Sequence, residues 1–308
     1  MEEKVEKLII IGSGPAGLAA AIYTARGNLQ PLVISGRTAG GQLMLTTDVD
    51  DFPGFPEGIQ GPDLMGKMRK QAERFETRFI EEDVLSVDFS KKPFTLKTET
   101  KTLQAEAVII ATGASAMWLN IPSEQKFIGK GVSACAVCDG FFFKNKKLIV
   151  VGGGDTAMRE AQHLSKYASE LTVIHRRDKL RAQDALVKLV QSKPNIKFRY
   201  NCAVEEVLGD QVVTGVKLKD TVTGEIIEME VGGIFIAIGH KPNTDFLKGQ
   251  IDLDEKGYIA VRDEVFSSKE GIFIAGDVSD QKYRQAVTAA GAGTKAALEV
   301  EHYLETIN

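Results

Sequence analysis

The chain has 308 residues, of which 43% are apolar and 26% are charged, and its formal net charge is −4. This length and composition suit about two globular domains with apolar cores and exclude a disordered chain. The acidic balance offers no broad basic face for nucleic acid, and no apolar run approaches the roughly 20 residues that span a bilayer. The N-terminus is charged rather than apolar, and three cysteines are too few for a secreted disulfide scaffold. We therefore expect a cytoplasmic protein without membrane or nucleic-acid partners.

The N-terminal segment predicts an apolar strand, a glycine turn and a helix. The strand covers residues 8–11, and the turn is a G-x-G-x-x-G fingerprint made of Gly12, Ser13, Gly14, Pro15, Ala16 and Gly17. The first glycine permits a tight turn, the second lets a pyrophosphate approach the backbone, and the third lets the helix pack on the strand. Unpaired N–H groups at the helix start then bind the phosphates. One such fingerprint alone is a weak signal, because glycine turns after strands are common.

The elements that follow alternate between strands and helices. A second strand is expected at 32–35, a helix from about 62 to 77, and a buried strand at 107–111 that ends in a tight turn at Gly113. This alternation is typical of an α/β domain.

Two of the three cysteines, Cys135 and Cys138, are separated by two residues. Such a pair can be half of a zinc site, but the remaining candidate ligands are Cys202 and four scattered histidines without paired spacing. We therefore expect no metal and prefer a redox dithiol, because a disulfide across two intervening residues is readily opened and closed. Asp139 is either the proton carrier of thiol–disulfide exchange or an exposed turn carboxylate. Cys202 is expected to be a structural thiol.

The first motif recurs 140 residues later along the chain. Residues 148–151 form another apolar strand, a second fingerprint follows, and residues 172–175 repeat the next strand. Two copies with matching flanks predict dinucleotide binding much more strongly than one, although a duplicated α/β unit without that role is the alternative. The second fingerprint contributes Gly152, Gly154, Asp155 and Thr156.

The type of nucleotide is indicated by the residues after the second strand of each copy. The second copy carries His175, Arg176, Arg177 and Arg181, and we expect Arg181 to share a helix face with Arg177. The planar fork of arginine suits the 2′-phosphate of NADPH, whereas an NAD site favours an acidic residue. A solvated basic helix start is the alternative. The first copy has no acidic residue at the matching positions 35–38.

The C-terminal half repeats the buried strand and turn of residues 107–113. Similar segments occupy 233–239 and 271–277, and an alanine-rich helix is expected from about residue 284 to 307. The simplest partition inserts the second nucleotide unit into the first, through connections at 114–120 and 240–246. The predicted fold class is α/β, with two Rossmann-like dinucleotide-binding domains, one inserted in the other. Residues 1–117 and 244–308 would form the first domain, and residues 118–243 the second.

The order of these motifs resembles that of low-molecular-weight thioredoxin reductases, over nearly the whole chain. The matching segments are G-x-G-x-x-G at 12–17, GGQL at 40–43, ATG at 111–113, C-x-x-C-D-G at 135–140, GGGD-x-A at 152–157, HRRD-x-x-RA at 175–182, GH-x-PNT at 239–244, GDV at 276–278 and YRQA-x-x-AAG-x-G at 283–293. The resemblance implies a homodimer with FAD in the discontinuous domain and NADPH in the inserted one. Electrons would pass from NADPH through FAD and the dithiol to thioredoxin.

The resemblance also implies roles for individual residues. Cys138 would be the sulfur next to the flavin, Cys135 would attack the disulfide of thioredoxin, and Asp139 would be the acid/base. The implied FAD positions are Gly12, Ser13, Gly14, Pro15, Ala16, Gly17, Gly41, Gln42, Thr46, Ala111, Thr112, Gly113, Gly276, Asp277, Arg284, Gln285 and Ala286. The implied NADPH positions are Gly152, Gly154, Asp155, Thr156, His175, Arg176, Arg177 and Arg181.

The sequence departs from the family pattern at three places. Thr38 stands where relatives often have a glutamate, Asp51 where they often have an asparagine, and Val137 where threonine is commoner. The contacts of the first two positions are therefore not carried over. Alternative functions are a related flavoenzyme that reduces another dithiol or oxidises small thiols, a ferredoxin-dependent enzyme, and a non-enzymatic FAD-binding redox sensor.

The spacing of the two reactive segments predicts a motion. Only 14 residues separate Cys138 from Gly152, so the dithiol and the NADPH fingerprint lie in one domain although both must reach the same flavin. Reacting atoms approach to about 3–3.5 Å, so one access face cannot serve both at once. We expect the inserted domain to swing on its two connections; a static enzyme that uses both flavin faces is the alternative.

Overall fold

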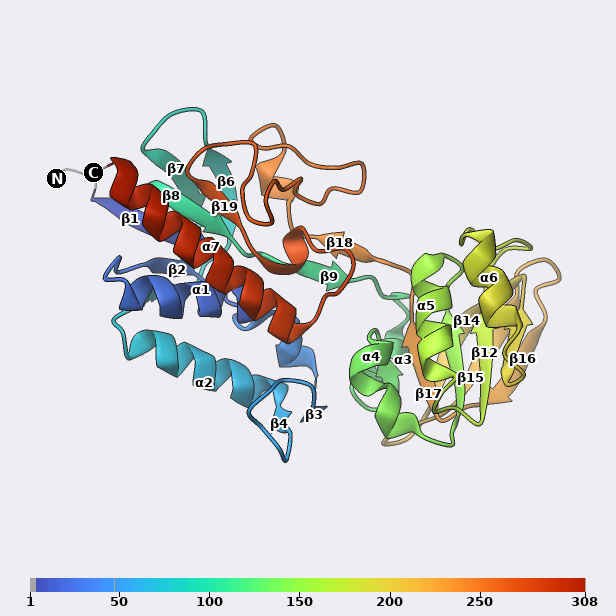
Figure 1. Cartoon of the computed structure of the whole chain (residues 1–308). Helices are drawn as coiled ribbons and strands as arrows, with labels where there is room; N and C mark the ends of the chain where they lie inside the picture. Colours follow the sequence, from blue (N-terminus) through green and yellow to red (C-terminus); the bar gives the residue numbers. More distant parts are fainter. Residues whose placement is uncertain (1–3, 47, 308) are drawn as a thin grey trace. The chain divides into compact units, whose positions relative to one another are not determined.

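The computed structural model describes residues 4–46 and 48–307 and divides the chain into two compact units (Figure 1). Unit 1 contains the chain up to Ser115 and from Lys241 onward, and unit 2 is Ala116–His240. The chain therefore leaves unit 1 once, completes unit 2, and returns. These crossings lie two and three residues before the boundaries expected from the sequence.

Unit 1 is built on a seven-stranded sheet whose strands run in the order β5-β2-β1-β8-β7-β6, with β19 also paired to β8. The strands are β1 (Val5–Ile11), β2 (Leu32–Ile34), β5 (Arg78–Ile80), β6 (Val84–Asp88), β7 (Phe94–Thr98), β8 (Thr102–Ile110) and β19 (Ile272–Ile274). Strands β5, β2, β1, β8 and β19 are mutually parallel, whereas β6 and β7 pair antiparallel.

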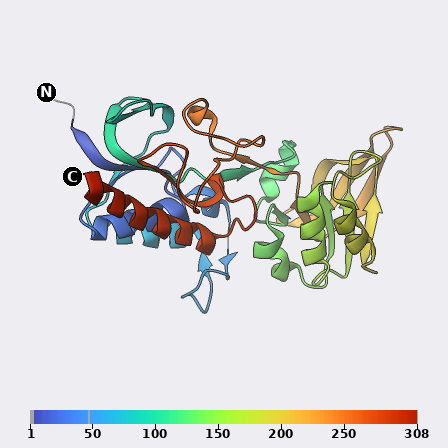
Figure 2. The ribbon, with the colours of Figure 1, turned by 45° about the horizontal axis from the view of Figure 1, so that its top comes forward.

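Three helices cover one face of this sheet: α1 (Pro15–Arg26), α2 (Gly61–Glu73) and α7 (Ala286–Ile307). Helix α7 runs beside α1 in both views (Figures 1 and 2), and the two share a core cluster with the strands. A Cβ atom on Gly293 would lie 2.0 Å from the carbonyl oxygen of Ala16, so only glycine allows this helix contact. The other face packs on a second cluster from β6, β7 and residues 247–278. Short elements complete the unit: β3 (Asp48–Val49), β4 (Ile59–Gln60), η1 (Gly41–Leu45), η3 (Asp245–Leu247) and η4 (Gly276–Val278).

Unit 2 has a five-stranded parallel sheet in the order β10-β17-β11-β12-β13 and a separate three-stranded antiparallel sheet, β14-β15-β16. The strands are β10 (Val132–Ser133), β11 (Lys147–Val151), β12 (Glu170–Ile174), β13 (Ile196–Arg199), β14 (Cys202–Gly209), β15 (Val213–Asp220), β16 (Ile226–Glu230) and β17 (Gly233–Ile236). Its helices are α3 (Pro122–Phe127), α4 (Ala136–Asp139), η2 (Gly140–Phe143), α5 (Asp155–Leu164) and α6 (Asp184–Gln191).

The internal repeat predicted from the sequence extends to the strand register. Ile9 pairs with Leu32 in unit 1, and Ile149 pairs with Thr172 in unit 2, both shifted by the same 140 positions. The hydrogen bond from the N–H of Gly12 to the carbonyl of Ile34 (2.8 Å) likewise recurs from Gly152 to Ile174 (3.0 Å). The two fingerprints therefore occupy equivalent turns, each at the carboxyl end of a central parallel strand, where α/β folds bind their ligands.

The two connections between the units pair with each other as a short ribbon. Strand β9 (Ala114–Ala116) pairs with β18 (His240–Pro242), and the N–H of Met117 donates to the carbonyl of Gly239 at 3.0 Å. The side chain of Asn243 donates to the carbonyl of Thr112 at 2.8 Å, and the Thr112 hydroxyl donates to the carbonyl of Asn243 at 2.9 Å.

Two predicted helical segments also differ from the structure. The helix expected to reach residue 77 ends at Glu73, because Glu76 takes a left-handed conformation (φ 65°) and the chain turns toward β5. The segment with Arg177 and Arg181 is not helical, as described below. In the described part of the chain, no helix is long and apolar enough to cross a membrane.

Candidate functional site

The fingerprint turn of unit 1 is shaped by close approaches of the chain to itself. Gly12 has a φ of 108°, and a Cβ on it would lie 2.3 Å from the carbonyl oxygen of Ala111, at the end of β8. A Cβ on Gly17 would lie 2.0 Å from the carbonyl oxygen of Gly12. Gly12 is therefore required for both packing and backbone conformation, and Gly17 for packing.

Gly14 is different, because nothing in its own surroundings requires glycine. Its φ is −71°, and a Cβ there would meet no atom within 4 Å. Gly154 in the second fingerprint is equally open, with a φ of −100°. Both lie immediately before a helix whose first N–H groups have no intrahelical acceptor. A phosphate group bound against the backbone would explain glycine at these two positions.

Most of the other residues predicted in unit 1 surround this turn. The Ser13 hydroxyl accepts the N–H of Gly40 (3.0 Å) and donates to the carbonyl of Ser35 (2.9 Å), which fixes the loop before η1. A Cβ on Gly41 would lie 3.5 Å from the Cα of Gly14, and one on Gly276 would lie 2.9 Å from the Cβ of Ala16. Gln42 is exposed on η1, whereas the methyl group of Thr46 lies against Gly61 at the start of α2.

Asp277, in η4, carries a buried carboxylate oxygen that lacks a partner. Its Oδ1 has no hydrogen bond among the described residues. Burial raises the pKa of Asp277 to about 7, and the negative charge of Asp280 adds to this effect while Arg284 opposes it. A ligand hydroxyl that donates to this oxygen would supply the missing hydrogen bond, so Asp277 fits a polyhydroxylated cofactor chain.

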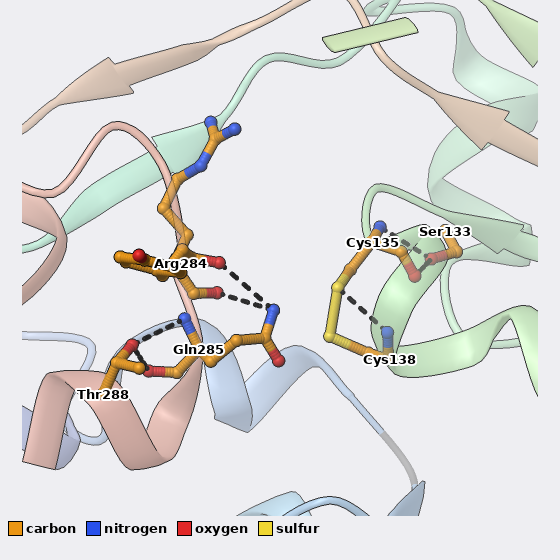
Figure 3. The surroundings of a disulfide bond; sticks show 7 residues. Ser133, Cys135, Cys138, Arg284, Gln285 and Thr288 are labelled. Carbon is orange, nitrogen blue, oxygen red and sulfur yellow. Dashed lines mark hydrogen bonds between the residues drawn. A yellow bond between two sulfur atoms is a disulfide. The ribbon is translucent and has the colours of Figure 1, made fainter. Parts of the chain in front are cut away.

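The turn before α7 has a strained backbone that is stabilised by side-chain hydrogen bonds. Arg284 has a φ of 48°, and the side-chain amide of Gln285 donates to the carbonyls of Tyr283 (3.3 Å) and Arg284 (3.1 Å) (Figure 3). The Gln285 carbonyl accepts the first bond of the helix, from Ala289 at 2.9 Å. The N–H groups that follow, beginning with Ala286, are free of intrahelical acceptors and carry the positive end of the helix dipole.

In unit 2, the second fingerprint is held by the loop that follows β12. A Cβ on Gly153 would lie 2.3 Å from the ring of His175, so the buried imidazole packs directly against the turn. The carbonyl of Gly153 accepts the N–H groups of Arg181 (2.7 Å) and Ala182 (3.1 Å). The carboxylate of Asp155 accepts both the backbone and the side-chain N–H of Gln183 (2.8 and 3.1 Å). His175 and Asp155 are therefore framework residues of the turn.

The arginines of this loop are exposed, but not on a helix. Residues 176–183 are not helical, and α6 begins only at Asp184, so the expectation that Arg177 and Arg181 share a helix face is wrong. The physical reason is that the N–H groups of residues 181 and 182 bond to Gly153 instead of to carbonyls four residues back. The loop nevertheless carries three arginines, Arg176, Arg177 and Arg181, on the segment that braces the fingerprint.

The dithiol predicted from the sequence is present as a disulfide between Cys135 and Cys138 (Figure 3). Cys135 caps the short helix α4, and its Sγ accepts the N–H of Cys138 at 3.2 Å. The N–H of Cys135 donates to the Ser133 hydroxyl at 3.0 Å. Both sulfur-bearing residues are partly exposed, as is Asp139, whose N–H donates to the carbonyl of Cys135 (3.1 Å). Cys202 is a buried free thiol, and burial raises its pKa.

Three contributors were not singled out from the sequence: Ser133, Gln183 and Tyr258. Ser133 stabilises the redox turn and Gln183 holds Asp155, whereas Tyr258 is buried near the charged groups of Asp277 and Arg284. No local spacing marks these residues, because each acts through a tertiary contact. Among the described residues, no cluster of three or more histidine, cysteine or acidic side chains forms a metal site.

Comparison with known proteins agrees with a nucleotide-dependent disulfide oxidoreductase. Residues 6–293 match the family described as "Pyridine nucleotide-disulphide oxidoreductase". The chain is 52% identical to a thioredoxin reductase of Streptomyces clavuligerus, over 98% of this chain and 95% of the relative. It is 50% identical to a protein of Pseudomonas fluorescens named glucosaminate ammonia-lyase, over 99% and 98%. The solved thioredoxin reductase of Giardia duodenalis matches with a TM-score of 0.93 and 44% identity, over 97% and 98%. The chain belongs to the pyridine nucleotide-disulphide oxidoreductase family.

Proposed function

We propose that this protein is an NADPH-dependent thioredoxin-disulfide reductase, a flavoprotein that uses FAD. The observation that carries this proposal is the Cys135–Cys138 disulfide, formed across a two-residue turn in the same unit as the second nucleotide fingerprint. Sequence identity alone does not distinguish a disulfide reductase from an ammonia-lyase, because a relative named as an ammonia-lyase is 50% identical. The disulfide favours the reductase, because disulfide reduction requires a redox-active cysteine pair and an ammonia-lyase reaction does not.

The residues of unit 1 fit FAD. The open turn at Gly14 fits a pyrophosphate, the unpaired Oδ1 of Asp277 fits a hydroxyl, and the N–H groups at the start of α7 fit the electron-rich edge of the flavin ring. In unit 2, Gly154 would receive the pyrophosphate of NADPH, and Arg176, Arg177 and Arg181 its 2′-phosphate. When bound, FAD supplies hydride acceptance from NADPH and two-electron transfer to the disulfide.

The next steps are carried out by the protein's own residues, beginning with Cys135 and Cys138 in the reduced dithiol state. The Cys135 thiolate attacks one sulfur of the thioredoxin disulfide, forms a mixed disulfide and releases the second thioredoxin thiolate, which takes up a proton. Cys138 attacks the Cys135 sulfur, re-forms the 135–138 bond and releases reduced thioredoxin. The N–H of Cys138, which points at Cys135 Sγ, stabilises negative charge on that sulfur. Asp139 would move the proton, as the residue adjacent to Cys138.

The surface beside the disulfide suits a protein substrate. Val137 is 55% exposed, Phe141 62% and Phe142 43%, although all three are large apolar residues. Exposed apolar side chains that flank a reactive group mark protein contact sites. The occupant we propose is thioredoxin, whose own disulfide must be brought to Cys135. We further propose a homodimer located in the cytoplasm, where a buried free thiol such as Cys202 stays reduced.

The test is a coupled assay with the purified, FAD-loaded protein. NADPH oxidation should require an intact thioredoxin and should stop when the thioredoxin cysteines are replaced by serine. NADPH consumption that proceeds with oxygen alone would support a thiol or NADPH oxidase instead. Bound flavin without any steady-state turnover would indicate a redox sensor, and ammonia release from glucosaminate would overturn the assignment. Light scattering of the same sample measures the oligomeric state.

A further inference from the structure

We propose that Tyr167 is a specificity-determining residue for the partner protein, because it fixes the exposed ring of Phe141 beside the redox disulfide. This inference rests on the proposed function and adds a residue that lies outside every motif discussed above. Tyr167 follows α5, and its own ring is only partly exposed. It would act as a positioning residue, since the contact with the partner is made by Phe141.

The Tyr167 backbone is held at both of its polar groups. Its N–H donates to the carbonyl of Leu164 at 2.9 Å, and its carbonyl accepts the N–H of Asn145 at 2.8 Å. The second bond ties Tyr167 to the segment that continues from Phe141. The base of the ring is therefore fixed relative to the segment on which Phe141 sits.

The ring of Tyr167 touches the redox segment at two points. It meets the Phe141 ring edge-on, with centroids 6.2 Å apart and planes at 84°. It also lies next to Gly140, where a Cβ would come within 3.5 Å of Tyr167 Cδ2 and 3.0 Å of Leu164 Cδ2. Gly140 has an ordinary helical φ of −56°, so close packing rather than backbone conformation favours glycine there. Tyr167 therefore spans the end of the redox turn and the first exposed aromatic after it.

His163 also packs against Tyr167. The two rings lie 5.6 Å apart at 53°, and His163 Cδ2 also faces Gly140. Burial and the neighbouring charge of Lys166 lower the pKa of His163, so the neutral imidazole packs against Tyr167 at neutral pH. Edge-on aromatic pairs contribute beyond the area that they bury. A ring that is 62% exposed keeps one orientation only if such neighbours hold it.

The predicted consequence is that Phe141 is already ordered when an apolar surface around the disulfide of the partner binds to it. Ordering an exposed side chain in advance reduces the cost of binding without changing the chemical step. Loss of the Tyr167 ring should therefore raise KM for thioredoxin and leave kcat unchanged.

The experiment compares Tyr167→Leu, Tyr167→Phe and His163→Leu with the wild-type holoenzyme. Tyr167→Leu should raise KM for thioredoxin about tenfold, Tyr167→Phe should restore it to within about twofold, and His163→Leu should raise it about threefold. In each variant, kcat and the rate at which NADPH bleaches the flavin absorbance should stay within about twofold of wild type. Tyr303→Leu is the matched control, because Tyr303 also packs on a phenylalanine, Phe273, within unit 1. Their ring centroids are 5.7 Å apart and their planes meet at 61°, and this variant should leave KM for thioredoxin unchanged.

A double-mutant cycle with Phe141→Leu separates positioning from simple contact. If Tyr167 acts through Phe141, the KM of the double variant equals that of Phe141→Leu alone. An unchanged KM for Tyr167→Leu, additive effects in the cycle, or a loss of kcat without a change in KM would overturn the inference. If Tyr167→Leu does not fold, Tyr167→Met, which also removes the ring, replaces it in the cycle with Phe141→Leu. A wild-type protein that reduces no thioredoxin would instead overturn the proposed function itself.

Discussion

The Sγ of Cys135 accepts a hydrogen bond from the backbone N–H of Cys138 at 3.2 Å, which makes the two cysteines chemically unequal. The N–H dipole favours the thiolate on Cys135, whereas Cys138 contributes only the donor. This asymmetry fits the role that we propose for Cys135, as the sulfur that exchanges with the protein substrate.

This asymmetry predicts different behaviour of the two cysteine variants. Cys138→Ser should form a stable mixed disulfide between Cys135 and thioredoxin, because no second sulfur remains to resolve it. Cys135→Ser should form much less, and both variants should lack turnover. Non-reducing gel electrophoresis with mass spectrometry of the trapped species measures this. Cys202→Ser serves as the control, since that thiol is buried and should leave activity intact. Preferential trapping by Cys135→Ser would reverse the roles.

The glycines of the two fingerprints should separate folding from nucleotide binding. Gly14→Ala and Gly154→Ala introduce a methyl group into open space at ordinary φ, so the apoprotein should unfold at the wild-type temperature or slightly above. Gly14→Ala should nevertheless lose FAD on purification, and Gly154→Ala should raise KM for NADPH at least about tenfold.

Gly12→Ala is the matched comparison, because its methyl group would collide with the carbonyl of Ala111 and its φ is positive. It should destabilise the apoprotein by at least about 1–2 kcal/mol. Thermal unfolding of FAD-free protein and visible absorbance measure the two effects. Equal destabilisation by Gly12→Ala and Gly14→Ala would contradict a ligand-based reason for Gly14.

Coenzyme preference should depend on the arginines after β12. Each charge-assisted hydrogen bond to the 2′-phosphate is worth about 1.5–3 kcal/mol, so NADPH should exceed NADH by at least about a hundredfold in kcat/KM. Arg176→Ala, Arg177→Ala and Arg181→Ala should each reduce kcat/KM for NADPH by about ten- to a hundredfold and leave NADH nearly unaffected. Lys188→Ala, an exposed cation on α6, is the control. Comparable efficiency of the wild type with NADH would refute the assignment.

The stability of the FAD-free protein should fall as pH rises from about 4 to 7. Burial raises the pKa of Asp277 to about 7, whereas in the unfolded chain the group titrates near 3.8. Between these values the folded state holds a proton that the unfolded state has lost, so the free energy of unfolding decreases with pH, by up to about 4 kcal/mol.

Asp277→Asn should abolish this decrease and be more stable than wild type at pH 8, although it should bind FAD more weakly. Glu255→Gln, at an exposed carboxyl of the same unit, should preserve the wild-type dependence. Urea unfolding at several pH values provides the measurement. A wild-type protein whose stability is flat over this range would contradict the raised pKa.

Turnover should require the two units to change their relative orientation. Gly140, two residues after Cys138, packs against the C-terminal end of α5, and the NADPH fingerprint lies at the N-terminal end. The ten residues of α5 span roughly 15 Å. If the flavin binds in unit 1 as we propose, both reactive groups of unit 2 need near-contact with it and must reach it in turn. The β9–β18 ribbon contains the connections on which such a motion would occur.

Amine cross-links between the units, mapped by mass spectrometry, test this motion. A protein whose two units are cross-linked to each other should perform at most one half-reaction. Cross-links within either unit should leave the rate of turnover unchanged. Steady turnover of the locked protein at the unlocked rate would show that no reorientation is needed.

Much of this protein is determined locally. The strand, turn and helix of each fingerprint follow from short apolar runs and from glycines that meet steric demands within a few residues. Their repetition after 140 positions predicted two equivalent folds, and the register of Ile9 and Ile149 with their partner strands agrees with it. The Cys135–Cys138 pairing is equally local, since only two residues separate the sulfurs.

Other features depend on contacts between distant segments, which no local pattern encodes. The segment at Arg181 is not helical because its N–H donates to the carbonyl of Gly153, although its sequence suits a helix start. The raised pKa of Asp277 arises from burial, which exists only in the folded chain. The proposed role of Tyr167 depends on its contacts with Gly140 and Phe141, which exist only in the folded chain. The sequence alone determined the nucleotide turns and the disulfide, because the residues that form each of them are only a few positions apart. Tertiary packing decided which side chains hold them in place, because those contacts join segments that meet only in the folded chain.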